Sequence, residues 1–252
     1  MPDFIASALA TDGLGWIALA ALVAGIVRGF AGFGTAMIFL PVAAQFLHPA
    51  QAMMVLIGMD ILGPLPIVSG AIRDAQWPDL RRLLFGMVLA LPFGLSLLLS
   101  VDPQVFRYTL AAISIGMVLC LVLGLRYTGQ MRPGVVFGTG AVGGFLGGVA
   151  GLPGPPVILL YMAGVFPSKV IRANTMLFLL VFDVALVLAF AAFGMLQVSF
   201  LVIGVLMAIP AAVGSVVGGF LFRPGYEKLY RAVAYAIIVF SALTGLPIWD
   251  KV

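Results

Sequence analysis

Charged residues are scarce in this sequence. Only 9% of its 252 residues are Asp, Glu, Lys or Arg, whereas a soluble domain carries about 25%. Apolar residues make up 63% of the chain, and the mean hydropathy is +1.22. These values exclude an ordinary soluble domain. We expect an all-α polytopic membrane protein, because helices satisfy their own backbone hydrogen bonds inside a bilayer.

Cysteine and histidine are almost missing, with one residue of each, Cys120 and His48. A single cysteine excludes an intrachain disulfide. His48 has no Cys or acidic neighbour at ligand spacing, which argues against a metal site. No Ser or Cys stands beside a plausible base, so we expect neither an enzyme nor a cofactor. The basic residues are dispersed in short loops, which argues against a nucleic-acid partner.

Hydrophobic runs fill most of the remaining chain. A helix needs about 20 residues to cross a bilayer, and the second and seventh runs are shorter than that, so they are either re-entrant or tilted. The first run lacks the basic start of a cleavable signal and is expected to remain in the mature protein. The ten predicted segments cover residues 14–29, 34–47, 51–71, 80–100, 104–125, 133–150, 154–166, 169–193, 197–222 and 227–248.

The basic residues predict the orientation of the chain. Ten of the thirteen lysines and arginines fall in the loops 72–82, 126–132, 167–172 and 223–231, which share one side of the membrane. The other side holds only Arg107 and Lys251. Because basic loops stay cytoplasmic, both termini are predicted to be periplasmic or extracellular.

The chain also repeats weakly at a period of about 120 residues. Each half holds an odd number of crossings, which predicts an inverted repeat of two five-segment halves, 1–127 and 128–252, within one transmembrane domain, 1–252. Five matches occur in the same order: Gly29–Phe33 with Gly148–Leu152, Ala50–Met53 with Ala173–Met176, Asp60 with Asp183, Gly86–Pro92 with Gly204–Pro210, and Phe106-Arg107 with Tyr230-Arg231.

Two glycine-rich stretches interrupt the hydrophobic segments. The first reads Arg28-Gly29-Phe30-Ala31-Gly32-Phe33-Gly34-Thr35 and the second Gly147-Gly148-Val149-Ala150-Gly151-Leu152-Pro153-Gly154-Pro155-Pro156. Broken helices survive in a membrane only where they are buried or line a cavity, and half-helices meeting at mid-membrane form the sites of many transporters. We therefore expect broken or re-entrant short helices that meet at mid-membrane.

These two stretches, together with Ala173-Asn174-Thr175, resemble the sulfite exporter TauE/SafE family, also called the 4-toluene sulfonate uptake permeases. The resemblance covers nearly the whole chain. It implies a carrier in the bacterial inner membrane for small sulfur-containing or organic anions such as sulfite, sulfoacetate or sulfonates. The second stretch has Pro153 where the first has Gly34, so the two breaks need not contribute equally.

Arg28 and the two helix starts are the candidate anion site. A guanidinium is always charged and matches sulfonate or carboxylate oxygens, while a helix N-terminus offers free N–H groups. Alternatively, Arg28 snorkels or pairs with Asp60, and the glycines serve helix packing, as we expect for Gly140, Gly144 and Gly148 and for Gly143, Gly147 and Gly151. The predicted substrate-binding residues are Arg28, Gly29, Gly32, Phe33, Gly34, Thr35, Gln51, Gly151, Leu152, Pro153, Gly154 and Asn174.

Two carboxylates and two amides occupy matched positions in the repeat. Asp60 and Asp183 lie in mid-segment, where a buried carboxylate can exchange a proton or bind Na⁺; the alternative is that each carboxylate holds its helix break in place. Gln51 and Asn174 start full-length helices and either cap them or reach the substrate.

These patterns together predict a secondary transporter that moves a small anion by alternating access, through a site between the two breaks, with H⁺ or Na⁺ as the coupling ion. The alternatives are a membrane-embedded accessory or assembly protein and an anion channel. The glycine ridges can pack helices within or between protomers, so a homo-oligomer is left open.

Overall fold

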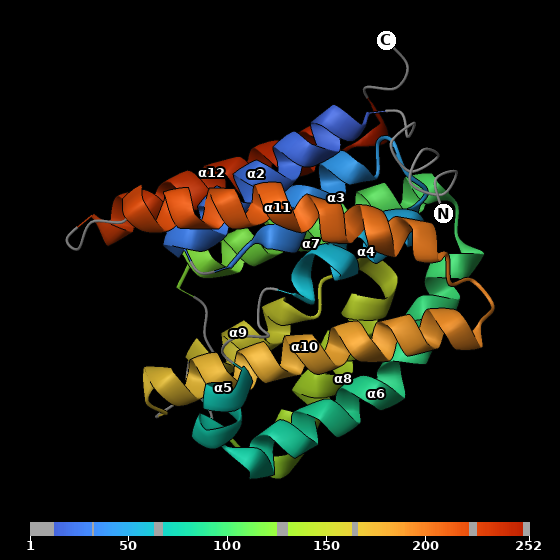
Figure 1. The fold of residues 1–252 in the computed structure, drawn as a ribbon. Helices are drawn as coiled ribbons and strands as arrows, with labels where there is room; N and C mark the ends of the chain where they lie inside the picture. Colours follow the sequence, from blue (N-terminus) through green and yellow to red (C-terminus); the bar gives the residue numbers. More distant parts are fainter. Residues whose placement is uncertain are drawn as a thin grey trace. The chain divides into compact units, whose positions relative to one another are not determined.

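The computed structural model describes residues 13–31, 33–62, 68–124, 131–162, 166–221 and 226–248. All regular elements in these ranges are α-helices, which confirms the all-α polytopic prediction (Figure 1). Six of the described helices are long and apolar enough to cross a membrane: α2 (Leu14–Ala31), α6 (Trp77–Ser100), α7 (Pro103–Val122), α8 (Pro133–Ala150), α10 (Ser168–Ala192, from Lys169) and α11 (Val198–Leu221). The other described helices are α3 (Thr35–Ala43), α4 (Pro49–Asp60), α5 (Val68–Asp74), α9 (Gly154–Met162) and α12 (Glu227–Thr244).

Nine of the ten predicted segments each correspond to one helix, with ends shifted by a few residues. The predicted segment 51–71 is wrong, because the chain forms two helices there, α4 and α5. The residues between them include Pro64 and Pro66. Proline lacks the N–H that an α-helix requires and clashes with the preceding turn. Because the neighbouring residues are apolar, hydropathy alone did not reveal the break.

Several helices begin with proline, where its missing N–H costs no hydrogen bond. Pro49 opens α4, Pro103 opens α7 and Pro133 opens α8. The carboxylate of Asp102 accepts a hydrogen bond from the N–H of Gln104 at 2.8 Å and so caps the start of α7. Three helices also carry proline in their interior, at Pro41, Pro92 and Pro210.

The chain forms two compact units, which we call unit 1 and unit 2. They do not coincide with the sequence halves 1–127 and 128–252, because each unit combines helices from both halves. Unit 1 comprises residues 1–63, 102–118 and 197–252 and holds α2, α3, α4, most of α7, α11 and α12. Unit 2 comprises residues 64–101 and 119–196 and holds α5, α6, α8, α9 and α10.

Unit 1 is built on the packing of α2 against α11, which lie side by side in Figure 1. Glycines make the contact close: a Cβ at Gly29 would lie 2.9 Å from the Cα of Gly218 and would overlap the carbonyl oxygen of Ser215. Gly214 lies against Leu22 and Gly218 lies against Ile26. Because the residue numbers on α2 and α11 increase together from one contact to the next, the two helices run parallel.

Unit 2 contains a second parallel pair, α6 and α8. The backbones of Leu83, Met87 and Leu91 on α6 contact the ridge Gly140, Gly144 and Gly148 on α8. Gly143 and Gly147, on the adjacent ridge, face Phe178 and Phe182 of α10. The packing role predicted for these glycines is therefore confirmed. In both units, small residues let two long helices approach at backbone distance.

Candidate functional site

The first glycine-rich stretch breaks a helix at the predicted place. Helix α2 ends at Ala31 and α3 begins at Thr35, with Gly34 as its N-cap. Gly34 has a φ of +99°, in the left-handed region, where a side chain would be strained. Gly32, also assigned to the substrate site, lies outside the described residues. The break is confirmed, whereas the re-entrant path of α3 stays a prediction.

Arg28 and Asp60 form an ion pair beside this break. Nη1 of Arg28 lies 2.7 Å from Oδ1 of Asp60, and 39% of the arginine side chain and 24% of the aspartate side chain are exposed. Arg28 stands in the last turn of α2, where the helix dipole favours a cation. Asp60 is the last residue of α4, not a mid-segment residue as predicted, and the dipole disfavours a carboxylate at a helix C-terminus. The guanidinium offsets that unfavourable position.

The pairing interpretation of Arg28 is thus confirmed, and its role in substrate binding stays a prediction. The neighbouring residues Phe33 and Gly34 are half-buried, and Thr35, at the first position of α3, is buried. Phe33 lies with its ring centroid 6.3 Å from that of Tyr235 on α12. The first break is therefore partly open, and both a charged pair and an aromatic pair lie close to it in the sequence.

The second break is built differently. Helix α8 ends at Ala150, and Gly151 follows as its C-cap with a φ of +67°, donating its N–H to the carbonyl oxygen of Gly147 at 2.8 Å. Leu152 and Pro153 are buried, and α9 begins at Gly154. Unlike the first break, this one is enclosed within its own unit.

The matched amides Gln51 and Asn174 behave differently. Oε1 of Gln51 accepts a hydrogen bond from the N–H of His48 at 3.1 Å, which confirms capping of α4. The capping prediction is wrong for Asn174, which lies within α10 and is fully buried. Its Oδ1 accepts from the N–H of Gln76 at 2.9 Å, and its Nδ2 donates to the hydroxyl of Tyr161 at 2.7 Å. The Asn174 amide therefore joins α9, α10 and the start of α6.

The two amides nevertheless make corresponding contacts. Nε2 of Gln51 lies 3.4 Å from Oε1 of Gln197, just before α11. Asn174 contacts Gln76, just before α6. Gln76 and Gln197 are separated by about the same interval as Gln51 and Asn174, close to the repeat period of about 120 residues. The contacts support the internal repeat, while the opposite insertion of its halves stays a prediction.

The remaining candidate residues are distributed over both units. Gly29 packs against α11, so helix packing accounts for it. Asp183 is half-buried in the middle of α10, as predicted. Arg28, Phe33, Gly34, Thr35, Gln51 and Asp60 belong to unit 1; Gly151, Leu152, Pro153, Gly154, Asn174 and Asp183 belong to unit 2.

Two buried polar groups were not predicted from the sequence. Arg107, for which the sequence predicted only a place on the outer side of the membrane, lies in α7 and is only 8% exposed, with its Nε donating to the carbonyl oxygen of Gly245 at 2.7 Å. Asp79 of α6 is 6% exposed and pairs with Arg82 at 2.7 Å. The position of Arg107 four residues after Pro103, inside an apolar run, is the signal that could have revealed it.

The family model of the sulfite exporter TauE/SafE family matches residues 17–244. The chain belongs to this family. The match includes both helix breaks and the Arg28–Asp60 pair. No curated protein and no solved structure matches the chain significantly. This TauE/SafE protein is therefore a membrane protein of a transporter family, in agreement with its six candidate spans.

Proposed function

We propose that this TauE/SafE protein is a secondary transporter of a small sulfur-containing or organic anion, such as sulfite, sulfoacetate or a sulfonate, in the bacterial inner membrane. Arg28 binds the anion, which takes the place of the Asp60 carboxylate at the guanidinium. The observation that carries the proposal is the ion pair between these residues, 2.7 Å long, at the partly open first break. Arg28 and Asp60 stand at the ends of two apolar helices, and because charges in a membrane helix are costly, the pair calls for a function.

Arg28 has the chemistry that an anion site requires. Its guanidinium keeps its charge at all pH values and offers two parallel N–H groups to a carboxylate, sulfite or sulfonate. Asp60 holds Nη1, and more than a third of the arginine side chain is exposed. An incoming anion therefore reaches the guanidinium without unpacking the helices.

The start of α3 adds a second source of positive potential. The first N–H groups of a helix have no intrahelical partner and carry part of the positive end of its dipole. Gly34, the N-cap of α3, has no side chain, so an anion can approach the backbone N–H groups at the start of this helix. Thr35 supplies a hydroxyl. The anion is bound between the guanidinium and these groups.

Exchange at Arg28 provides a simple coupling mechanism. When the anion binds to Arg28, the carboxylate of Asp60 loses its partner. It then takes up a proton or binds Na⁺, so that one negative and one positive charge enter the site together. Without such uptake an unpaired carboxylate would remain at the C-terminal end of α4, where the helix dipole disfavours it. This linkage makes the transport of the anion depend on the cation gradient.

Transport by purified protein in liposomes tests the proposal, with labelled sulfite, sulfoacetate, thiosulfate, taurine, lactate and chloride as candidates. We expect counterflow for one chemical class among these anions. Arg28→Gln weakens its apparent affinity about 10- to 100-fold, because a charge-assisted hydrogen bond is lost, and Arg28→Lys weakens it less. Arg132→Gln, at an exposed cation before α8, is the matched control. Full transport by a folded Arg28→Gln variant refutes the site.

The coupling step is tested separately. Asp60→Asn keeps counterflow but loses accumulation driven by a pH or Na⁺ gradient, and the gradient that drives the parent identifies the ion. Asp183→Asn is the matched control from the other repeat half and keeps accumulation. Loss of accumulation in Asp183→Asn alone would assign coupling to that residue instead. Uptake without counterflow indicates a channel, and no flux of any anion indicates an accessory protein.

The second break is tested by Gly154→Ala. The nearest atom to a Cβ at Gly154 is Cδ2 of Leu179, 3.8 Å away, an ordinary van der Waals distance. The substitution therefore leaves the fold intact and adds a methyl group at the start of α9. A weaker apparent affinity supports a role of this break in substrate binding, and unchanged transport removes Gly154 from the site.

A further inference from the structure

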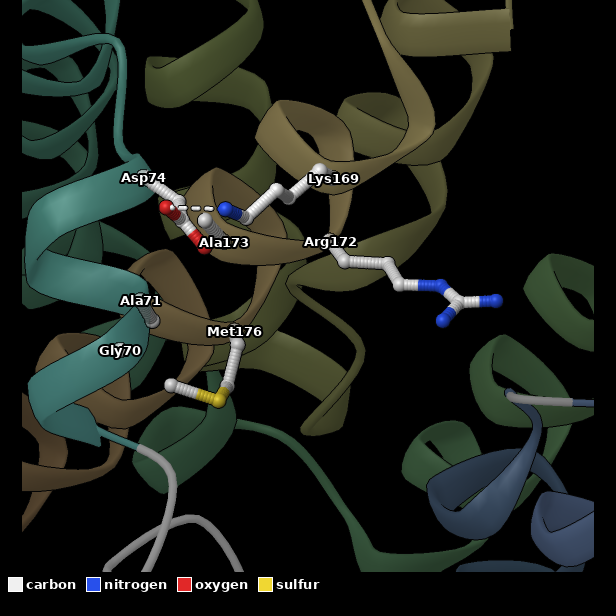
Figure 2. Close-up of a pocket in the computed structure, with 7 residues that line it drawn as sticks. All are labelled: Gly70, Ala71, Asp74, Lys169, Arg172, Ala173 and Met176. Atoms are coloured by element: carbon white, nitrogen blue, oxygen red, sulfur yellow. Dashed lines mark ion pairs between the residues drawn. The ribbon is translucent and has the colours of Figure 1, made fainter.

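A pocket between α5 and α10 belongs to unit 2, whereas Arg28 and Asp60 belong to unit 1. Its volume is about 420 Å³, space for more than about ten water molecules at roughly 30 Å³ each. That is much larger than a sulfite or small sulfonate needs. Its lining comprises Gly70, Ala71 and Asp74 of α5 and Lys169, Arg172, Ala173 and Met176 of α10 (Figure 2).

The lining changes from charged to apolar along α10. Lys169 and Arg172 lie in the first turns of the helix, and Met176 follows seven residues after Lys169, about 10 Å further along the axis. Because α10 is a candidate membrane span from Lys169 onward, its charged end lies at the membrane surface. The apolar end of the pocket then faces the depth of the hydrocarbon.

The charges at the pocket mouth leave one cation available. Nζ of Lys169 lies 2.9 Å from Oδ1 of Asp74, and this pair links α10 to α5. Arg172 is exposed and has no hydrogen-bond or ion-pair partner among the described residues. Figure 2 shows its side chain extending away from the Lys169–Asp74 pair. Two cations and one carboxylate give the lining a net charge of +1.

We propose that this pocket binds an anionic phospholipid, with the phosphate at the basic end of α10 that carries Lys169 and Arg172, and the glycerol and upper acyl chain against Ala71, Ala173 and Met176. An amphipathic occupant fits the charged-to-apolar gradient, whereas a small hydrophilic anion would leave Met176 unused. Basic residues at the cytoplasmic membrane surface attract anionic lipids, and the charge distribution of the chain predicts that this end of α10 faces the cytoplasm. The bound lipid seals the space between the short helix α5 and α10.

Lipid retention measured by native mass spectrometry tests the proposal on the full-length protein. The purified protein is titrated with dioleoyl phosphatidylglycerol or dioleoyl phosphatidylcholine. We expect one phosphatidylglycerol to be retained more tightly than phosphatidylcholine. The double substitution Lys169→Gln with Arg172→Gln weakens that retention about tenfold or more, since each cation near an anionic lipid contributes roughly fivefold.

A filling variant tests the pocket without changing its charge. A Cβ at Gly70 meets no atom within 4 Å, so Gly70→Phe projects a ring into the pocket and is expected to displace the lipid. Gly138→Phe is the matched control, because a Cβ added at Gly138 of α8 also meets no atom within 4 Å. The matched charge control is Arg81→Gln with Arg132→Gln, at exposed cations outside the pocket.

Three results would overturn the proposal. Equal retention of the two lipids shows that the phosphate-binding cations do not select the headgroup. Unchanged phosphatidylglycerol retention in both pocket variants places the lipid elsewhere. A soluble anion is the occupant if free glycerol 3-phosphate raises the melting temperature as much as phosphatidylglycerol does, and if the charge variant loses both of these increases. None of these readouts depends on transport through Arg28.

Discussion

The side-chain amide of Asn174 donates a 2.7 Å hydrogen bond to the hydroxyl of Tyr161, joining α10 to the last turn of α9. Its oxygen accepts a second bond from the backbone of Gln76. Helix α9, which follows the second break, is thereby tied to the two long helices α10 and α6. The matched amide Gln51 makes its contacts instead with His48 and Gln197, next to α4 and α11.

Substitution of the two matched amides is expected to have unequal effects. Asn174→Ala leaves the buried hydroxyl of Tyr161 and the half-buried N–H of Gln76 without their partner, and the cost is about 1–3 kcal/mol. Gln51→Ala removes an exposed capping contact and costs about 0.5–1 kcal/mol. Thermal unfolding of the purified protein should show the larger fall in melting temperature for Asn174→Ala. Equal shifts would mean that the Asn174 contacts add nothing beyond capping.

One substitution should have opposite effects at two positions of α2. Gly25→Ala places a methyl group 2.9 Å from the carbonyl carbon of Ala211, and overpacking of this kind costs about 1–3 kcal/mol. Gly15→Ala meets no atom within 4 Å and should stabilise the helix by about 0.5–1 kcal/mol. Melting temperatures of both variants check this. A stable Gly25→Ala protein contradicts the close packing of α2 on α11.

Arg107 is expected to stabilise the end of α12. It donates to the carbonyl oxygen of Gly245, the C-cap residue of that helix. Arg107→Met removes this charged donor from a buried site, so we expect a loss of about 1.5–3 kcal/mol, partly restored in Arg107→Lys. Arg132→Met, at an exposed arginine, is the control. The yield of folded protein and its melting temperature give the comparison, and similar values for the two Met variants would refute this role.

The predicted orientation can be tested with fusion proteins. Alkaline phosphatase joined to Val252 should be active, because both termini are predicted to be periplasmic, whereas a fusion after Gly129 should be inactive. Green fluorescent protein at the same two positions should give the opposite pattern. The reverse result at both positions would invert the topology and move the pocket at Lys169 to the outer leaflet.

Hydropathy and the placement of glycine were sufficient to predict most of the fold. Apolar length revealed nine of the ten segments as single helices, since a membrane-spanning helix is a local feature of the chain. The left-handed Gly34 and Gly151 mark the two breaks because only glycine adopts that conformation without strain. The segment 51–71 misled because its hydropathy stays high throughout, although α4 ends at Asp60 and α5 begins only at Val68.

Only the tertiary structure decided which charges and helices meet. Arg28 and Asp60 lie far apart in the chain, and the choice between pairing and snorkelling depended on the packing of α2, α4 and α11. The same holds for the burial of Arg107 and for the pairing of α6 with α8. Local sequence sets where a helix begins and ends, but the partner of a buried polar group is set by which helices pack together, and that depends on long-range contacts.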